Sequence, residues 1–282
     1  MKKLELEPPR FDWYQATVET SPDELIYRAT SALANEPLVA ITPRHGYDRG
    51  LEFRRDGARS AVLYHGGIHD NPHIMASGED APSLAGLLRG AELPHRVSRA
   101  DVCVDTDTPG SYRRMYSALR RLVRENGKLS ATLMCNPDDA QAGATYYVGS
   151  PASEVRARLY EKGKQMKDEQ RPHWVRYEVQ ARPQRERKAW TSTASEWDIL
   201  GSALWAREFA QDTLSLGVSA PPKRSERVSD LEGSLRALSR QYGRRLDELA
   251  QKHGGDMSSV GAELLLRAGN RRGLLPEPEG VI

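Results

Sequence analysis

The sequence predicts an α+β fold, in which an antiparallel or mixed sheet carries helices on one face and is open and charged on the other. Three stretches alternate apolar with charged side chains, namely residues 97–105, 155–162 and 174–180. The second and third are joined by residues 163–173, which is short enough for a hairpin and so for antiparallel neighbours. Strands with one apolar face need helices on that face only.

The N-terminal part of the chain predicts strands around one helix. Residues 13–19 alternate apolar and polar side chains, as a half-buried strand does. Ser21 as N-cap and Pro22 at the first helical position then start a helix. Short strands separated by glycine-rich turns are expected over residues 38–76, followed by a short helix over residues 82–89.

The remaining helices divide the chain. Residues 112–126 predict an amphipathic helix with its arginines mostly outside the apolar face. A Pro-Pro pair opens a linker over residues 221–229, so residues 1–220 are expected to form one domain and residues 230–282 a C-terminal helical extension. In that extension a glycine pair separates a long helix from a second one over residues 258–267. The extension is expected to pack on the main domain, with homodimer formation or DNA contact as alternatives.

Composition and charge narrow the class of protein. The 282 residues include 41 Lys and Arg against 39 Asp and Glu, a net charge of +2. No apolar run approaches the length of a transmembrane helix, and the N-terminus lacks the apolar core of a signal peptide. Two cysteines cannot make a disulfide framework or a cysteine-based zinc site. We therefore expect a cytoplasmic protein without a membrane partner.

Basic residues gather locally despite the small net charge, which suits contact with a phosphate backbone. Clusters lie over residues 113–124, 156–167 and 181–188. The alternative is a solvated helix and loop surface. The residues expected to contact DNA are Arg113, Arg114, Arg120, Arg121, Arg124, Arg156 and Lys164.

The charged face of the three strands holds the residue types for metal-assisted attack of a tyrosine on a phosphodiester. Carboxylates hold a hard divalent cation, the cation polarises the phosphate, and Arg or Lys side chains seat the flanking phosphates. Tyrosine is a weak nucleophile at its free pKa of about 10, so nearby cations are expected to favour the phenolate. The face carries Asp101, Glu178, Tyr160, Arg156, Arg158 and Lys162.

Spacing limits which carboxylates share an ion. Asp101 and Asp105 are four residues apart, roughly 13 Å along a strand at about 3.3 Å per residue. Asp101 is therefore expected to pair across strands with Glu178, whereas Asp105 either joins them or caps the next helix. The alternative interpretation is ion pairing of these carboxylates with Arg99 and Arg176, and ordinary sheet packing of the tyrosine.

Four short blocks carry a family resemblance: residues 98–105 (SRADVCVD), 145–150 (TYYVGS), 155–163 (VRARLYEKG) and 174–179 (WVRYEV). In this order they resemble the replication initiation factor family, the rolling-circle initiators of plasmids and filamentous phages with the related relaxases of integrative conjugative elements. The resemblance covers roughly residues 11–215, and the FDWY opening and the PHIMASG segment also resemble phage-type members.

The resemblance implies an enzyme that nicks one DNA strand at an origin, stays joined to the 5′ phosphate through tyrosine, and leaves a 3′-OH. The implied cofactor is Mg²⁺ or Mn²⁺. The implied partners are single-stranded or cruciform origin DNA, a host helicase and a host polymerase, and residues 1–220 would be the catalytic domain. The residues it assigns are Tyr160 as nucleophile, Arg158 and Lys162 beside it, and Asp101, Glu178 and Asp105 at the metal.

One segment departs from the family. A glutamate often precedes the small-residue–Ser-Gly block, but residues 74–77 read IMAS, so a metal ligand there would be missing. Three histidines recur every four residues from His65 to His73, but glycines and a proline between them prevent one helix from presenting all three. His73 alone remains a candidate partner for Asp101. Fallback nucleophiles near the same strands are Tyr146, Tyr147 and Tyr177.

Three functions are consistent with these residues. The favoured one is a rolling-circle initiator, and the close alternative is a relaxase that starts conjugative transfer by the same chemistry. The third is a DNA-binding regulator that has the fold without catalysis. It is disfavoured because the tyrosine, the flanking cations and two carboxylates share one expected face.

Overall fold

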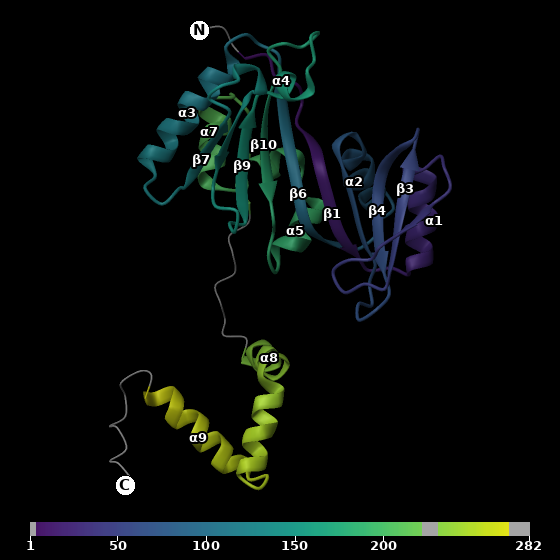
Figure 1. Cartoon of the computed structure of the whole chain (residues 1–282), viewed down its shortest axis with the longest axis vertical. Coiled ribbons are helices and arrows are strands. Elements are labelled where there is room, and N and C mark those ends of the chain that lie inside the picture. Colours follow the sequence, from purple (N-terminus) through teal and green to yellow (C-terminus); the bar gives the residue numbers. More distant parts are fainter. Residues whose placement is uncertain (1–3, 222–230, 271–282) are drawn as a thin grey trace. The chain divides into compact units, whose positions relative to one another are not determined.

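A computed structural model describes residues 4–221 and 231–270 of the chain. The chain divides into two units, Met1–Arg224 and Ser225–Ile282. The first unit contains a ten-stranded sheet in the order β2-β3-β4-β5-β1-β6-β10-β9-β8-β7 (Figure 1). Every neighbouring pair is antiparallel. The α+β prediction is confirmed, and of the two sheet types it allowed, the antiparallel one is found.

The strands β1, β6, β9 and β10 coincide with the stretches where alternation was seen, and β2 to β5 fall in the region where short strands were expected, whereas β7 and β8 were not predicted. β9 and β10 are antiparallel neighbours, as the short connection between them predicted. Their connection is not a plain loop, because it contains the short helix α4. The strands are β1 (Arg10–Val18), β2 (Val39–Ile41), β3 (Arg49–Arg55), β4 (Ala58–His65), β5 (His73–Ser77), β6 (His95–Thr106), β7 (Ala131–Cys135), β8 (Ala144–Val148), β9 (Val155–Tyr160) and β10 (Val175–Ala181).

The helices also follow the sequence signals. Ser21 accepts a hydrogen bond from the backbone N–H of Glu24 at 3.3 Å, so the predicted N-cap of α1 is confirmed. The helix α3 begins after Gly110, not under an Asp105 cap, so that suggestion was wrong. The helices are α1 (Pro22–Leu33), α2 (Ala81–Gly90), α3 (Ser111–Glu125), α4 (Lys162–Met166), α5 (Arg187–Thr193), α6 (Glu196–Leu200), α7 (Leu204–Asp212), α8 (Leu231–Lys252) and α9 (Met257–Asn270).

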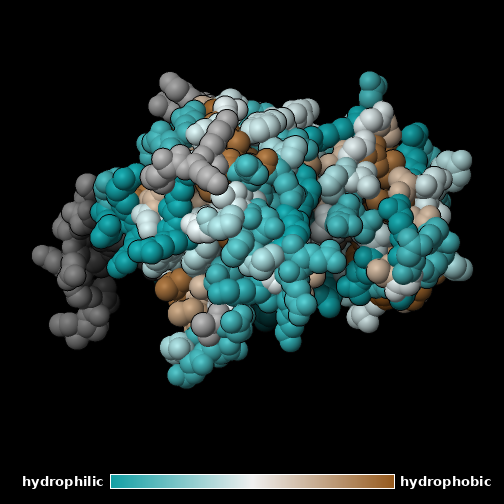
Figure 2. Space-filling model, turned by 90° about the horizontal axis from the view of Figure 1, so that it is seen from above, coloured by the Kyte–Doolittle hydropathy of each residue, from teal (hydrophilic) through white to brown (hydrophobic). Residues whose placement is uncertain are grey.

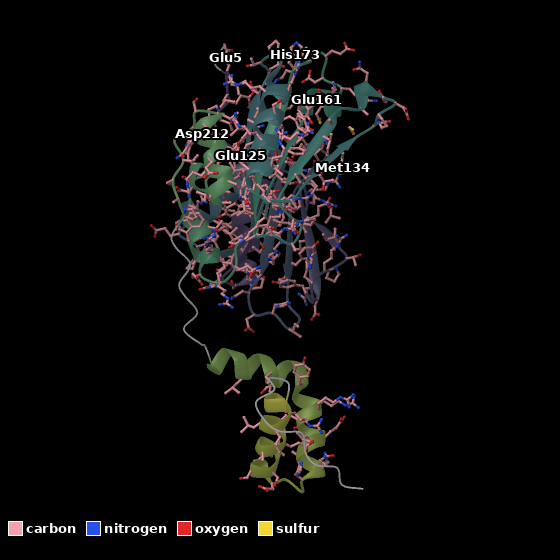
Figure 3. All side chains as sticks on the ribbon, turned by 90° about the vertical axis from the view of Figure 1, so that its left-hand side faces the viewer. Glu5, Glu125, Met134, Glu161, His173 and Asp212 are labelled. Atoms are coloured by element: carbon pink, nitrogen blue, oxygen red, sulfur yellow. The ribbon has the colours of Figure 1, made fainter. Side chains whose placement is uncertain are left out.

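Apolar side chains on one face of the sheet form the core of the first unit. Leu159 and Tyr177 on that face are buried, and so are Met115 and Leu119 of α3 and Phe209 of α7. Figure 3 shows Glu125 of α3 and Asp212 of α7 together on one side of the strands. Helices therefore cover this face, which we call the covered face, and the opposite one is the open face.

A β-bulge in β1 changes which residues reach the open face. Phe11 pairs with Val102 and Trp13 pairs with Asp101, so Asp12 is an extra residue between two consecutive pairs. Phe11 and Tyr14 are both buried in the core, three positions apart rather than two. Asp12 and Trp13 consequently both lie away from the core, on the open face.

The described part of the second unit, residues 231–270, contains two helices joined by a glycine turn. Gly254 and Gly255 have positive φ angles of 60° and 85°, which a residue with a side chain adopts only with strain. The predicted helix pair is thus found, while the expected linker lies almost entirely outside the described residues. None of the helices in the described ranges combines the length and apolar character of a membrane span. Hydrophilic residues predominate on the face drawn in Figure 2.

Candidate active site

A cavity of about 920 Å³ opens on the open face of the sheet, where β1, β6, β9 and β10 meet. Tyr160, Arg158, Lys162 and Asp101 line it. Glu178 is only 1% exposed and is covered by the ion pair that it makes with Arg158. The structure therefore brings the predicted tyrosine, both flanking cations and both favoured carboxylates to one place.

Tyr160 belongs to a row of paired residues that runs across β9, β10 and β6, and the other members of this row form an ionic network. Tyr160 pairs with Arg176, which pairs with Asp105 on β6. The Arg176 guanidinium donates two hydrogen bonds to Asp105, at 2.7 and 2.8 Å, and a third to Asp12 at 2.7 Å. Arg10 donates to Asp105 at 2.6 Å. Burial alone would raise the pKa of Asp105, but the two arginines outweigh it and hold this pKa below its usual value.

The next row of paired residues on this face contains Glu178 on β10, which pairs in register with Arg158 on β9. Arg158 donates to Glu178 Oε1 at 2.8 Å, whereas the buried Oε2 has no hydrogen-bond partner within the described residues. Burial raises the pKa of Glu178 to about 7; Arg158 opposes this rise, and the charges of Asp101 and Asp12 add to it. A positive charge placed beside Oε2 would therefore relieve an unfavourable anion.

Asp101 sits diagonally across the β6–β10 pair from Glu178, because Asp101 pairs with Gln180 and Cys103 pairs with Glu178. Its carboxylate accepts hydrogen bonds from Arg99 at 2.9 and 2.5 Å, and one from Gln180 at 3.3 Å. Ion pairing of Asp101 with Arg99, the alternative drawn from the sequence, is thus present.

Tyr160 is 6% exposed, and its ring lies beneath two cations. The Arg158 guanidinium is 5.3 Å and Lys162 Nζ 5.8 Å from the ring centroid. Burial raises the pKa of Tyr160 above its usual value, Glu178 raises it further, and Arg176 and Arg158 only partly offset them. Arg158 thus favours the phenolate, as was expected of the nearby cations, but burial outweighs it and the pKa of Tyr160 is raised overall.

The fallback tyrosines separate by face. Tyr146 stacks edge-on against Tyr116 of α3, and Tyr177 packs on Phe209 of α7, so both belong to the covered face. Tyr147 lies on the open face, where it pairs in register with Arg158. Tyr147 is therefore the one fallback candidate that shares a face with Tyr160.

The donor set fits an open divalent-cation site rather than a closed protein cage. Among the described residues, no group of three or more His, Cys, Asp or Glu side chains is placed to hold a metal ion. Mg²⁺ commonly takes one or two carboxylates and keeps water or substrate phosphate oxygens as its other ligands. Asp101, which lines the cavity, would supply one such carboxylate, and Glu178 would supply another through Oε2, which has no hydrogen-bond partner among the described residues.

His73 does not join Asp101. It pairs in register with Thr17 on β1, whereas Asp101 pairs with Trp13, four residues or roughly 13 Å further along that strand. The His73 ring is bonded to Gln15 at 2.9 Å and to Thr17 at 3.1 Å, and burial lowers its pKa to about 4. These contacts hold the buried His73 side chain against β1.

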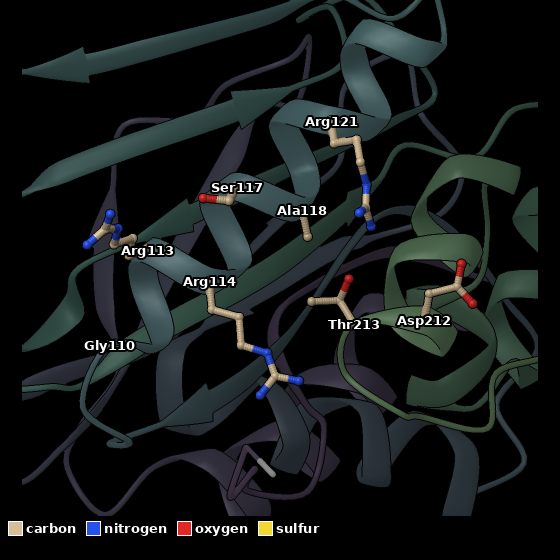
Figure 4. A pocket seen from close by; sticks show the side chains of 8 residues that line it. All are labelled: Gly110, Arg113, Arg114, Ser117, Ala118, Arg121, Asp212 and Thr213. Atoms are coloured by element: carbon tan, nitrogen blue, oxygen red, sulfur yellow. The ribbon is translucent and has the colours of Figure 1, made fainter. Parts of the chain in front are cut away.

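The predicted DNA-contacting residues fall on both faces. Arg156 lies on the open face, with its guanidinium 4.1 Å from the ring centroid of Tyr147, and Lys164 pairs with Glu161 at 2.9 Å. The arginines of α3 lie on the covered side, because α3 packs on β8 and β9 through its buried face. Three of them, Arg113, Arg114 and Arg121, line a cavity of about 520 Å³ with Asp212 and Thr213 (Figure 4).

Changing Arg120, Arg121 and Arg124 to Ala together is expected to weaken duplex binding and to flatten its salt dependence. Each lost phosphate contact lowers the slope of log K against log[salt] by about 0.9, so three contacts remove two to three units on that rough scale. Because α3 lies on the face opposite Tyr160, adduct formation on a short single strand should not change. Titrations of cognate and scrambled duplexes over a salt series measure the slope, with Arg28→Ala as control. An unchanged slope would show that this helix is solvated surface.

Sequence reasoning missed several side chains of the cavity. Asp12 and Trp13 reach it only through the bulge in β1, and Trp174 enters it just before β10. Arg10 was missed because it acts through Asp105, 95 positions away. One signal in the sequence could have revealed Asp12 and Trp13. The buried apolar residues Phe11 and Tyr14 are three positions apart instead of two, which is the spacing that a β-bulge produces.

Replacing Asp105 with Asn is expected to lower the free energy of unfolding by about 3–5 kcal/mol, since it leaves the buried Arg176 without its main counter-charge. Because the folded-state pKa of Asp105 lies below its unfolded value, this stabilisation is complete above the unfolded pKa and disappears as the pH falls through the folded one. Urea unfolding at neutral and acidic pH measures it. Glu24→Gln, which removes an exposed pair with Arg28, should change stability by less than about 1 kcal/mol. If the two variants lowered stability equally, the conclusion that Asp105 stabilises the fold through its buried ion pair with Arg176 would be contradicted.

Comparison with known proteins adds evidence at the level of family and fold. Residues 99–207 match the replication initiation factor family. A search of curated proteins gives no match. Among solved structures, the chain is similar to the rolling circle replication initiator protein from Geobacillus stearothermophilus, with a TM-score of 0.52 and 19% sequence identity. That likeness covers 76% of this chain and 99% of the other.

The family match spans three of the four strands that meet at the cavity, β6, β9 and β10, and continues into α7. It is shorter than the region over which the sequence resemblance was seen, because β1 to β5 lie outside it. The structural likeness extends further along the chain. The resemblance to the replication initiation factor family is therefore confirmed, by sequence over residues 99–207 and by the fold of a rolling-circle replication initiator.

Proposed function

We propose that this chain nicks and rejoins one DNA strand at a replication origin, with Tyr160 as the nucleophile. The observation that carries the proposal is the position of Tyr160 in the wall of the 920 Å³ cavity, between Arg158 and Lys162 and one strand from Glu178. An exposed phosphodiester can enter such a cavity from the open face. The family match supports a role in replication initiation.

The proposed step is a transfer of the phosphate from sugar to protein. Tyr160 Oη forms a bond to phosphorus, the bond from phosphorus to the 3′ oxygen breaks, and the DNA 5′ phosphate stays on the tyrosine. The phenol loses its proton and the departing oxygen gains one, giving a 3′-OH. Arg158 and Lys162 are placed to hold the non-bridging oxygens, where negative charge increases. Rejoining is the reverse reaction.

The raised pKa of Tyr160 means that the free protein holds a neutral phenol at physiological pH. Asp101 and Glu178 are the residues that would hold Mg²⁺ or Mn²⁺. When bound, such a cation supplies Lewis-acid polarisation of the phosphate and makes the phenol easier to deprotonate. We assign Asp105 to positioning instead, because two arginines pair with it and it does not line the cavity, whereas Asp101 lines the cavity and Glu178 has an oxygen without a hydrogen-bond partner among the described residues.

A covalent trapping experiment tests the proposal with substrates that assume no particular origin sequence. The full chain is incubated with Mg²⁺ or Mn²⁺ and a pool of single-stranded oligonucleotides randomised in sequence. Adducts that survive denaturation are recovered, their DNA is sequenced, and the modified peptide is identified by mass spectrometry. The expected result is a phosphotyrosine at Tyr160 and an enriched sequence motif. A chain that binds DNA but never forms an adduct is a regulator with this fold.

The relaxase alternative uses the same residues and the same chemistry. The DNA motif recovered by trapping decides between the two, because it can be located either in a replication origin or in a transfer origin. Host helicase, host polymerase and a homodimer remain predicted partners.

A further inference from the structure

Two tryptophans, Trp13 and Trp174, line the same cavity as Tyr160, and an arginine guanidinium lies over each of their rings. The Arg171 guanidinium is 4.1 Å from the ring centroid of Trp174, and that of Arg99 is 4.1 Å from the ring centroid of Trp13. Both indoles are half-buried, so part of each ring is accessible from the cavity. The proposed phosphate transfer uses neither of them.

Their positions follow from the strand register. Trp174 precedes Arg176 by two residues, and Arg176 pairs with Tyr160, so Trp174 lies on the open face one step beyond the tyrosine. Trp13 lies on β1, three strands from β9 in the sheet order, which is about 14 Å at about 4.8 Å per strand. Its register continues through Asp101 and Gln180 to Arg156, four residues or roughly 13 Å along β9 from the tyrosine. The tyrosine is therefore next to one indole and about 20 Å diagonally across the sheet from the other.

The other three tryptophans are placed differently. Trp190 and Trp205 pack against the hydrophobic core, and Trp197 on α6 is 39% exposed outside the cavity. Packing against the core therefore explains Trp190 and Trp205. Trp13 and Trp174 instead border a polar cavity that Lys162 also lines. A large aromatic ring at the wall of a cationic cavity is the arrangement that binds unpaired nucleotides.

We infer that Trp13 and Trp174 are stacking sites for the bases of single-stranded DNA that flank the phosphate presented to Tyr160. This inference rests on the proposed function. An indole or a guanidinium plane stacks on any base that is not already stacked within a duplex, and the adjacent arginine contacts the backbone. The arrangement holds the strand at Trp174, next to the reacting phosphate, and again further along at Trp13, and it selects unpaired over paired DNA.

Binding without cleavage tests the inference. All variants are made in a Tyr160→Phe parent, and affinity for labelled oligothymidylate of about 12 nucleotides is measured in EDTA by fluorescence anisotropy. Trp13→Ala and Trp174→Ala are each expected to weaken binding about 5- to 150-fold, the range found when one base–aromatic stack is removed. The Phe variants should keep most of the affinity. Trp197→Ala, outside the cavity, is the matched control and should bind as the parent does.

Two further measurements keep the test decisive. Trp13→Leu and Trp174→Leu retain apolar bulk while removing the aromatic face, so they replace any alanine variant that fails to fold. Oligothymidylate should quench tryptophan fluorescence in the parent and quench it less when Trp13 and Trp174 are both Phe. Unchanged affinity in the Ala and Leu variants overturns the inference. If affinity is unchanged but the wild type forms a normal Tyr160 adduct, the stacking inference fails and the proposed function stands. If the variants lose binding but the wild type forms no adduct, the stacking inference stands and the proposed function fails.

Discussion

Replacing Tyr160 with Phe is expected to abolish the covalent protein–DNA adduct and to lower nicking by roughly four orders of magnitude or more, the scale on which loss of a nucleophile acts. The substitution removes only the phenolic oxygen. The ring that contacts Arg158 and Lys162 stays, so the cationic surroundings should keep their arrangement. DNA binding should consequently change little, which separates a chemical role from a structural one.

The measurement is a denaturing gel of the variant incubated with a cleavable single strand and Mn²⁺. Tyr147→Phe is the matched control, because Tyr147 lies on the same face and pairs in register with Arg158 on β9. That control should form adduct at the wild-type rate. An adduct that persists in Tyr160→Phe and disappears in Tyr147→Phe would move the nucleophile to β8.

The strands and the helix starts could be predicted from the sequence because they depend on local patterns. Alternation over residues 97–105 and 174–180 identified β6 and β10, and the short connection before residue 174 predicted that β9 is the antiparallel partner of β10. The Ser21 cap likewise depends on side chain and backbone within one turn. Signals of this kind do not depend on what the rest of the chain does.

The pairing of charges within the site could not be predicted in the same way. Asp105 and Arg176 are 71 positions apart, and only the register of β6 against β10 decides that they meet. The register of β9 against β10 places Glu178 beside Arg158, so the sequence could not tell which arginine would neutralise which carboxylate. The Asp12 contact needs, in addition, the bulge in β1, for which the spacing of Phe11 and Tyr14 is the one local signal.

The helix α3 shows a third limit. Its amphipathic pattern correctly predicts that Met115 and Leu119 are buried. Such a pattern identifies the buried side of a helix, but not the face of the sheet on which the helix packs. Its arginines and the Tyr160 cavity are on opposite faces, so any duplex that contacts both has to pass around the edge of the sheet. β7, where Met134 is 59% exposed (Figure 3), forms the edge nearer to α3.

Asp101→Asn and Glu178→Gln are each expected to lower metal-supported nicking by roughly 10²-fold or more, the effect of several kcal/mol of lost charge stabilisation at the phosphate. Both substitutions keep the size of the side chain and remove its negative charge. Glu178 already has a pKa raised to about 7 by burial, which shows how poorly the protein alone supports a second anion beside Asp101. A bound cation would remove that penalty. An amide side chain carries no negative charge, so it would not bind the cation in this way.

Ion pairing gives a competing account of the same two variants, and metal titration separates them. If Asp101 and Glu178 only hold Arg99 and Arg158, the variants will react more slowly at every Mn²⁺ concentration with the same half-saturation point. If they hold the cation, the half-saturating Mn²⁺ concentration will rise while affinity for oligothymidylate in EDTA stays within about twofold of the parent. Glu24→Gln, which removes an exposed pair with Arg28 on α1 and lies outside the cavity, should change neither quantity. Wild-type nicking that continues undiminished in EDTA would remove the metal from the mechanism and leave the arginines of the site as its source of positive charge.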